Sequence, residues 1–303
     1  MSRQIVILDC DTLVQRPFDF HFDCTIKEYG NTLPDETAAH IAGAEIIITN
    51  KVLINAQHIA TNPQLKLIAV AATGYNNVDT EAAAKAGVGV CNIRAYGNES
   101  VAEHAFMMML ALMRNLPAYQ RDVAAGTWEK SPLPFFFTAP IRDLNGKTLA
   151  IFGRGNIGNT LADYARAFHM KVIFGEHKHA QSVREGYTPF AEAIRNADVI
   201  SLHCPLSEAT ANMIGEPELQ QMKPGAILIN CGRGGLVDET ALVAALKYGQ
   251  LGGAGFDVLT EEPPRHGNLL LKAHLPNLII TPHVAWGSEE AQNRLFDILS
   301  DNI

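Results

Sequence analysis

The chain has 303 residues, of which 47% are hydrophobic, and a formal net charge of −8. This length and hydrophobicity allow a substantial buried core and favour two domains over one. The acidic balance argues against a broad nucleic-acid surface, which would need a basic stripe, although one buried cation can still bind an anionic substrate.

No segment at the N-terminus or in the apolar helical region has the pattern of a signal peptide or a membrane span. Residues 5–8 are Ile-Val-Ile-Leu, which predicts a first strand and not the long apolar core of a signal peptide. Residues 105–113 are apolar, but a bilayer requires about 20 such residues. The five cysteines are odd in number and lack CxxC spacing, which is typical of reduced thiols. We therefore expect a cytoplasmic protein.

Short β-branched runs in the first hundred residues predict buried parallel strands. They lie at residues 5–8, 46–49, 67–71 and 88–92. Helical patterns occur between them, at residues 34–42 and 79–86. This alternation of strand and helix predicts an α/β sheet with right-handed crossovers.

A long apolar helix is predicted over residues 99–121, with Ser100 as its cap and Pro117 as an interruption. Residues 122–142 then lack a regular period and are rich in Pro and aromatic residues. Three consecutive phenylalanines lie in this segment, at positions 135–137, and we expect other protein groups to cover them. They either pack on the parent domain or cover a second subunit. We favour the second interpretation, in which residues 122–142 contact a second subunit.

A second α/β pattern follows, with a helix at residues 157–167. Its predicted strands are residues 148–152, 171–174, 199–202, 226–230, 253–256 and 278–281. The final helix, residues 288–302, comes after this pattern is complete and is expected to return to the first domain. We therefore predict two doubly wound α/β domains. The first domain is discontinuous, residues 1–98 and 284–303, and the inserted second domain, residues 99–283, has the strand and helix order of a Rossmann fold.

A Gly-x-Gly-x-x-Gly motif, Gly153 to Gly158, stands between a predicted strand and a predicted helix. Gly153 permits the tight turn, Gly155 lets the backbone approach a pyrophosphate, and Gly158 lets the helix lie close to the strand. The helix opens at Asn156 and Ile157, where free N–H groups can bind phosphate. Arg154 either adds a charge contact or is an exposed side chain. The motif predicts a dinucleotide site.

An acidic residue follows the next predicted strand. Glu176 lies 18 positions after Gly158. A carboxylate at this place accepts hydrogen bonds from the adenosine ribose and repels a 2′-phosphate, which favours NAD over NADP. The neighbouring His177 and Lys178 could offset part of that repulsion.

Three further residues follow predicted strands of the second domain and supply complementary chemistry. Arg233 follows residues 226–230, and its guanidinium can hold a carboxylate by two parallel hydrogen bonds. A pair with Asp238 is the structural alternative. His283 follows a Thr-Pro lead-in and can exchange a proton near neutral pH. Glu262, made rigid by the prolines after it, favours the protonated imidazole when it lies beside one.

The sequence resembles the D-isomer-specific 2-hydroxyacid dehydrogenases over almost its whole length. The matching segments are residues 153–158, 233–239, 255–258, 262–263 and 281–283. Within the family the chain is most similar to the glycerate dehydrogenase, or hydroxypyruvate reductase, group. Residues 71–79, 90–92, 100–103 and 202–206 carry this closer resemblance.

The resemblance implies a role for each matching residue. Arg233 would hold the substrate carboxylate and carbonyl oxygen, His283 would be the acid and base, and Glu262 would tune His283. Asp257 would meet the nicotinamide carboxamide, and Cys231 and Pro205 would lie near that ring.

The family resemblance also implies a second contact with the substrate carboxylate and an overall organisation. Backbone N–H groups of Ala72, Thr73 and Gly74 would bind the carboxylate from the first domain. That domain would be flavodoxin-like and completed by the C-terminal helix, and the protein would be a homodimer through residues 100–142.

The expected activity is NAD(H)-dependent reduction of a small 2-oxo acid, with hydroxypyruvate first and glyoxylate second. The rivals are another D-2-hydroxy acid, such as D-lactate or 3-phosphoglycerate, and a non-catalytic NAD-sensing protein. Residues 75–78 have no obvious basic cluster beside them, and this absence argues against a phosphorylated substrate. The segments His-Phe-Asp-Cys at residues 21–24 and His-Lys-His at residues 177–179 lack a second cluster at ligand spacing, so no metal site is predicted.

Overall fold

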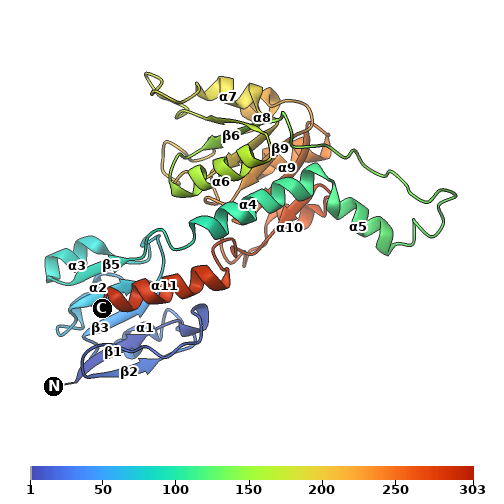
Figure 1. The fold of residues 1–303 in the computed structure, drawn as a ribbon. Helices are drawn as coiled ribbons and strands as arrows, with labels where there is room; N and C mark the ends of the chain where they lie inside the picture. Colours follow the sequence, from blue (N-terminus) through green and yellow to red (C-terminus); the bar gives the residue numbers. More distant parts are fainter. Residues whose placement is uncertain (1) are drawn as a thin grey trace. The chain divides into compact units, whose positions relative to one another are not determined.

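A computed structural model describes residues 2–303, and the chain divides into two compact units (Figure 1). Unit 1 comprises Met1–Gly97 and Gly287–Ile303, and unit 2 comprises Asn98–Trp286. The chain thus leaves unit 1 once and returns to it. The sequence places the breaks after residues 98 and 283, so the observed second break lies slightly later.

Unit 1 is a parallel five-stranded sheet with the strand order β2-β1-β3-β4-β5. The strands are β1 (Arg3–Ile7), β2 (Cys24–Glu28), β3 (Ile46–Thr49), β4 (Leu67–Val70) and β5 (Gly89–Asn92). The helices are η1 (Cys10–Thr12, a 3₁₀ turn), α1 (Thr37–His40), α2 (Ala56–Ala60), α3 (Thr80–Ala86) and α11 (Glu289–Asp301). This strand order is the flavodoxin-like one, which confirms the predicted architecture.

Three elements of unit 1 are absent from the sequence prediction, and all are short: η1, β2 and α2. Strand β2 lies at the edge of the sheet and pairs only with β1 among the described strands. Its sequence, Cys-Thr-Ile-Lys-Glu, includes charged residues, which blunt an exposed edge but remove the apolar pattern of a buried strand. Helix α2 has a single buried residue, Ile59, and therefore shows no hydrophobic period.

Unit 2 is a parallel six-stranded sheet with the strand order β11-β10-β9-β8-β6-β7. Its strands are β6 (Thr148–Phe152), β7 (Lys171–Phe174), β8 (Val199–Leu202), β9 (Ala226–Asn230), β10 (Leu251–Phe256) and β11 (Leu278–Ile280). Its helices are α4 (Asn98–Met113), α5 (Leu116–Ala124), α6 (Asn156–Ala167), α7 (Phe190–Asn196), α8 (Glu216–Gln221), α9 (Glu239–Lys247) and α10 (Leu269–Ala273). The Rossmann-type doubly wound sheet is therefore as predicted.

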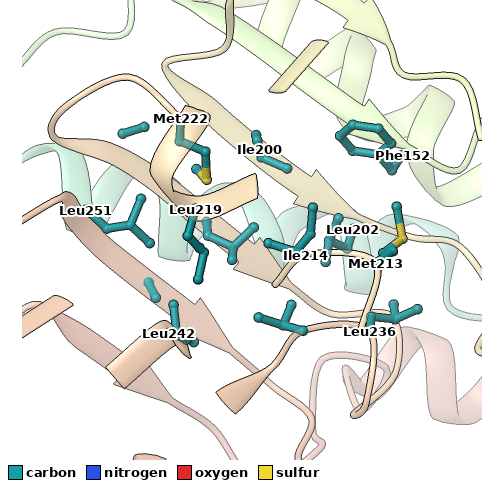
Figure 2. Close-up of a cluster of buried hydrophobic side chains, with 14 of the residues drawn as sticks. Phe152, Ile200, Leu202, Met213, Ile214, Leu219, Met222, Leu236, Leu242 and Leu251 are labelled. Atoms are coloured by element: carbon teal, nitrogen blue, oxygen red, sulfur yellow. The ribbon is translucent and has the colours of Figure 1, made fainter. Parts of the chain in front are cut away.

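Both faces of this sheet are buried, because alternate residues of each strand enter two separate cores. On one face Leu149 and Ile151 pack with α4 and α6. On the other face Phe152, Ile200 and Leu202 pack with Leu219 of α8 and other apolar side chains, as Figure 2 shows. Burial on both faces explains why these strands are almost continuous apolar runs.

The predicted helix over residues 99–121 is wrong in two respects. The chain forms two helices, α4 and α5, and Asn115 between them has a left-handed φ of 51°. Pro117 lies in the first turn of α5, where its missing N–H costs nothing. Ser100 is not a cap: it lies inside α4, and its hydroxyl donates to the carbonyl of Ala285 at 2.6 Å.

Over residues 2–303, no helix combines the length and the apolar character that crossing a bilayer requires. The same residues contain no group of three or more His, Cys, Asp or Glu side chains arranged to hold a metal ion. The five cysteines are free thiols.

Candidate active site

The glycine-rich turn connects the carboxyl end of β6 to the first turn of α6. Gly153 has a φ of 110°, and a Cβ there would lie 2.5 Å from the carbonyl carbon of His203, just beyond β8. A Cβ on Gly158 would lie 2.1 Å from the carbonyl oxygen of Gly153, so this approach of helix and turn requires glycine. Gly155 faces open space, and no side chain caps α6 there. A pyrophosphate fits this turn, with the helix N–H groups as donors.

Glu176 follows β7, and its carboxylate is occupied by protein donors. Arg184 binds it with Nη2 2.6 Å from Oε1 and Nε 2.8 Å from Oε2. The backbone N–H groups of His177 and Arg184 add bonds of 2.8 and 3.0 Å. The hydrogen bond from Arg184 lowers the pKa of the Glu176 carboxyl to about 2. The acid is therefore ionised, buried and neutralised by its partner.

Arg233 lies in the loop after β9, which Asn230 holds in place. The side-chain amide of Asn230 donates to the carbonyl of Arg233 at 2.9 Å and accepts from the N–H of Gly232 at 3.0 Å. Asp238, the alternative partner, instead caps α9. Throughout residues 2–303, no ion pair joins Arg233 to a carboxylate, and its Nη1 donates only to the carbonyl of Gly232. The guanidinium is exposed and available to an anionic ligand.

His283 and Glu262 form a close pair beyond the ends of β11 and β10. Nδ1 of His283 lies 2.6 Å from Oε2 of Glu262, and Oε1 of Glu262 accepts from the N–H of Leu259 at 2.8 Å. A carboxylate at Nδ1 fixes the ring orientation and leaves Nε2 for a substrate. His283 has a φ of 55°, and its N–H donates to the carbonyl of Asp257 at 2.8 Å. A strained backbone held in this way is typical of functional sites.

The loops that carry Arg233 and Glu262 are in direct contact. A Cβ on Gly234 would lie 1.8 Å from the carbonyl oxygen of Leu259, so only glycine permits this approach. The first residue of α9, Glu239, accepts from the N–H and the hydroxyl of Thr260 at 2.9 and 2.8 Å. The three neighbouring parallel strands β9, β10 and β11 therefore place a cation, an acid and an imidazole at their carboxyl ends, on one side of the sheet.

The comparison with known proteins decides the family. Residues 106–285 match the D-isomer specific 2-hydroxyacid dehydrogenase, NAD binding domain, family. The chain belongs to the D-isomer-specific 2-hydroxyacid dehydrogenases. It is 46% identical over 304 residues to a glycerate dehydrogenase from Methylorubrum extorquens, covering 100% of this chain and 96% of that protein.

Two further relatives resemble this dehydrogenase over most of their lengths. A hydroxypyruvate reductase from Blautia hydrogenotrophica is 36% identical over 272 residues, with 89% of this chain and 84% of the relative covered. The crystal structure of a D-lactate dehydrogenase from Aquifex aeolicus with NAD and lactic acid has a TM-score of 0.81 and 29% identity, covering 98% and 93% of the two chains. The protein is thus an NAD(H)-binding oxidoreductase that acts on a CH–OH group.

Asp257 of the dehydrogenase is buried and anchors the loop that carries His283. Its Oδ1 accepts from the hydroxyl of Thr281 at 2.5 Å and from the N–H of Val284 at 2.9 Å, and its Oδ2 accepts from the N–H of Ala285 at 2.9 Å. Nε2 of His104 lies 2.9 Å from the same hydroxyl of Thr281. The sequence singles out Thr281 only as the lead-in to His283 and does not indicate His104, whereas the structure joins both to the Asp257 cluster. The predicted contact of Asp257 with the nicotinamide stays a prediction.

Other residues predicted to bind the cofactor also follow the carboxyl ends of strands in this sheet. Pro205 follows β8, and its carbonyl accepts from the hydroxyl of Thr210 at 2.8 Å. Burial raises the pKa of the Cys231 thiol, so Cys231 is neutral at physiological pH. His203 is a second histidine at a strand end, but burial lowers its pKa to about 4. It is therefore uncharged near neutral pH and is a poor proton donor compared with a histidine paired to a carboxylate.

In unit 1 the loop after β4 carries Ala72, Thr73 and Gly74. The hydroxyl of Thr73 donates to the carbonyl of Ile93 at 2.9 Å, and Asn92 donates to the carbonyl of Thr73 at 2.8 Å. Among the residues that the structure describes, none accepts a hydrogen bond from the N–H groups of these three loop residues. Successive free N–H groups at the carboxyl end of a parallel strand suit an anion.

Replacing Gly155 with Ala is expected to weaken NADH binding with little loss of stability. The new Cβ has space in the protein but would enter the volume that a pyrophosphate needs. Because α6 has an ordinary extended N-cap at this residue, the cost to stability should be about 1 kcal/mol or less. Gly158→Ala is the contrast, since its Cβ would overlap a backbone oxygen and should lower the unfolding midpoint. Fluorescence titration with NADH and chemical denaturation measure the two effects, and wild-type affinity in Gly155→Ala would contradict the phosphate assignment.

Proposed function

We propose that this dehydrogenase reduces hydroxypyruvate to D-glycerate with NADH, and glyoxylate to glycolate as a second substrate. The observation that carries the proposal is the 2.6 Å contact between His283 and Glu262, beside a loop whose Arg233 has no carboxylate partner among residues 2–303. The relatives named glycerate dehydrogenase and hydroxypyruvate reductase support the substrate.

The chemistry follows from the three side chains. Arg233 binds the carboxylate of the 2-oxo acid in a bidentate manner and polarises its carbonyl oxygen. His283, protonated beside Glu262, gives the proton at Nε2 to that oxygen as the alkoxide forms. Glu262 stays ionised, orients the ring through Nδ1 and stabilises the imidazolium before transfer. When bound, the reduced nicotinamide supplies the hydride that reaches the carbonyl carbon. In unit 1, residues 72–74 are proposed to add N–H donors to the substrate carboxylate.

We propose NAD(H) as the working cofactor, with Gly153–Gly158 at the pyrophosphate and Glu176 near the adenosine ribose. An acidic residue at the end of β7 supports this choice over NADP(H). The ion pair with Arg184 reduces the repulsion that Glu176 would exert on a 2′-phosphate, so the preference need not be strict. Asn156, Ile157 and Arg154 are proposed to line the same subsite.

We also propose that the dehydrogenase is a homodimer that uses unit 2 as its interface. An apolar cavity of about 670 Å³ lies on the face of α4 and α6, and its lining includes Phe106, Met107, Leu110, Tyr164 and Phe168. Figure 1 shows α5 and the irregular segment after it extending away from the sheet of this unit. Phe135 and Phe137 of that segment are 54% and 77% exposed. Apolar surface of this extent is expected to be covered by a second copy.

Sedimentation velocity tests the dimer. The wild-type chain should sediment as a dimer, and the double variant Met107→Asp with Phe168→Asp should sediment as a monomer because both carboxylates would be buried at the interface. Tyr248→Asp is the matched control, since Tyr248 is 89% exposed at the end of α9 and away from the interface helices. A monomeric wild-type protein at all concentrations would contradict this interface.

A panel of 2-oxo acids tests the substrate and separates the rivals. Hydroxypyruvate should give the highest kcat/KM, followed by glyoxylate, with pyruvate and phosphohydroxypyruvate lower. Arg94 and Tyr75 line an open cavity of about 380 Å³ in unit 1, but a single Arg is a weak phosphate site. The highest kcat/KM with phosphohydroxypyruvate or pyruvate would replace the proposed substrate. Binding of NADH without turnover of any acid would favour a sensing role.

The free thiols and the cofactor suit the cytoplasm, where we propose that the enzyme works.

A further inference from the structure

Arg184 uses only part of its guanidinium in the ion pair with Glu176. Its Nε and Nη2 bind the buried carboxylate of Glu176, whereas the side chain of Arg184 itself is 52% exposed. Among the described residues, no acceptor is bonded to its Nη1. The guanidinium also lies over the ring of Tyr187, with its carbon 4.0 Å from the ring centroid. It therefore presents unused donors to solvent beside the acid that is expected to meet the adenosine ribose.

A second guanidinium lies in the same place. The guanidinium carbon of Arg154 is 4.7 Å from the ring centroid of Phe174 and 5.6 Å from that of Tyr187. Its Nη1 is 2.8 Å from the position that a Cβ on Gly186 would take, so it lies against the segment that carries Arg184. The structure shows no ion pair between Arg154 and a carboxylate within residues 2–303. Arg154 and Arg184 therefore both lie over the ring of Tyr187, close to the carboxyl end of β7.

Lys178, the other nearby cation, is already engaged. Its Nζ lies 2.9 Å from Oε1 of Glu218 and donates to the carbonyl of Met213 at 3.1 Å. The only acid that touches Arg184 among the described residues is Glu176, and Glu185, its exposed neighbour in sequence, makes no ion pair in that range. The single charge of Glu176 is cancelled by Arg184, and Arg154 adds a positive charge that the exposed Glu185 offsets in part. Repulsion of a 2′-phosphate by Glu176, the usual effect of an acid here, is therefore reduced.

We infer that Arg184 is a specificity-determining residue through which the dehydrogenase binds NADP(H) as well as NAD(H). Its free donors can bind the dianionic 2′-phosphate, with Arg154 as a second cation, while the bonds to Glu176 hold the guanidinium in place. With NAD(H), the same guanidinium can remain on Glu176 while its Nη1 donates to a ribose hydroxyl. This inference rests on the proposed placement of the adenosine ribose at the end of β7.

The competing explanation is that Arg184 only fixes the segment after β7. The Nε and Nη2 bonds to Glu176 join the two ends of residues 176–184, so their loss could change the whole subsite. A purely structural role would affect ligands with and without a 2′-phosphate equally. A specificity role would affect one and spare the other, and this difference is measurable with cofactor fragments.

Isothermal titration with 2′,5′-ADP and 5′-AMP isolates the subsite, because the two fragments differ by one 2′-phosphate and lack the nicotinamide. Wild-type protein should bind 2′,5′-ADP with an affinity within about tenfold of that for 5′-AMP. Arg184→Gln should weaken 2′,5′-ADP by about tenfold or more and 5′-AMP by less than about threefold. The control is Arg166→Gln, which removes an exposed arginine paired with Asp163 on α6 and should change neither affinity. Titrations with NADPH and NADH should follow the two fragments.

Two results would overturn the inference. One is wild-type protein that binds 2′,5′-ADP at least tenfold more weakly than 5′-AMP, because Glu176 would then exclude the phosphate despite its partner. The other is an Arg184→Gln variant that loses both fragments equally or neither. Since no substrate is present, a protein that shows the expected pattern but does not reduce hydroxypyruvate contradicts the proposed function alone.

Discussion

Replacement of His283 by Ala is expected to lower the turnover of hydroxypyruvate by about 10²–10⁴-fold, which is the usual contribution of a general acid. The variant loses the ring whose Nδ1 lies 2.6 Å from Glu262, and with it the proton donor for the carbonyl oxygen. Binding of NADH should change little, because the glycine turn and the residues after β7 are distant in sequence and lie on other strands. Steady-state kinetics and a fluorescence titration measure the two quantities separately.

The chain offers a matched control for this variant. Nδ1 of His266 lies 2.7 Å from Oε1 of Glu261, so His266→Ala also removes a histidine from a carboxylate pair. The His266 side chain is 87% exposed, however, and is not at the end of a strand. His266→Ala should keep turnover near the wild-type value. Wild-type turnover in His283→Ala, or an equal loss in both variants, would remove His283 from the mechanism.

Replacement of Arg233 by Gln is expected to lower kcat/KM by roughly 30-fold to several thousand-fold, equivalent to about 2–5 kcal/mol, if bound substrate buries the charge pair that it forms with Arg233. The guanidinium is the one group of the β9 loop that can bind a carboxylate and a carbonyl oxygen together. Arg233→Lys should recover only part of the loss, because an ammonium keeps the charge but not the fork geometry.

The pattern of the loss identifies the role of Arg233. Because the carboxylate is bound both before and during the reaction, KM should rise as well as kcat fall. Asp238→Asn is a suitable control, since Asp238 caps α9 and makes no ion pair with Arg233 in the described chain. If Arg233→Gln retains the wild-type kcat/KM, another cation binds the substrate, and Arg94 of unit 1 would be the next candidate.

The strands of unit 2 could be predicted from the sequence because both faces of their sheet are buried. Residues 148–152, 171–174, 199–202 and 226–230 match β6 to β9 in both bounds, since burial on both faces leaves almost no polar residue inside them. Elements without that burial were missed. Strand β2 is an edge strand with charged side chains, and α2 has only Ile59 buried.

The types of residue at the site were predictable from single positions, but their contacts were not. His283 and Glu262 stood out because each follows a strand and has an adjacent proline, and the structure places them in contact. The contacts of Asp257 with Thr281 and His104 join distant parts of the chain, and no local period records them. Roles for these residues in catalysis stay predictions.

Arg184 illustrates the same limit more sharply. Its partner Glu176 was recognised from its spacing after the glycine motif, and its free carboxylate was assumed from that spacing. The arginine lies in an irregular segment without helix or strand, where neither hydrophobic period nor motif indicates a position. Only the folded chain shows that the acid is buried and already paired.

The most direct test of the central claim is the rate of NADH oxidation by the wild-type protein with hydroxypyruvate, together with chiral analysis of the product. We expect rapid oxidation, one D-glycerate formed for each NADH consumed, and loss of this rate in His283→Ala but not in His266→Ala. No oxidation of NADH by a folded protein that binds the cofactor, or formation of L-glycerate, would contradict the assignment of Arg233, Glu262 and His283 as a D-2-hydroxyacid dehydrogenase site.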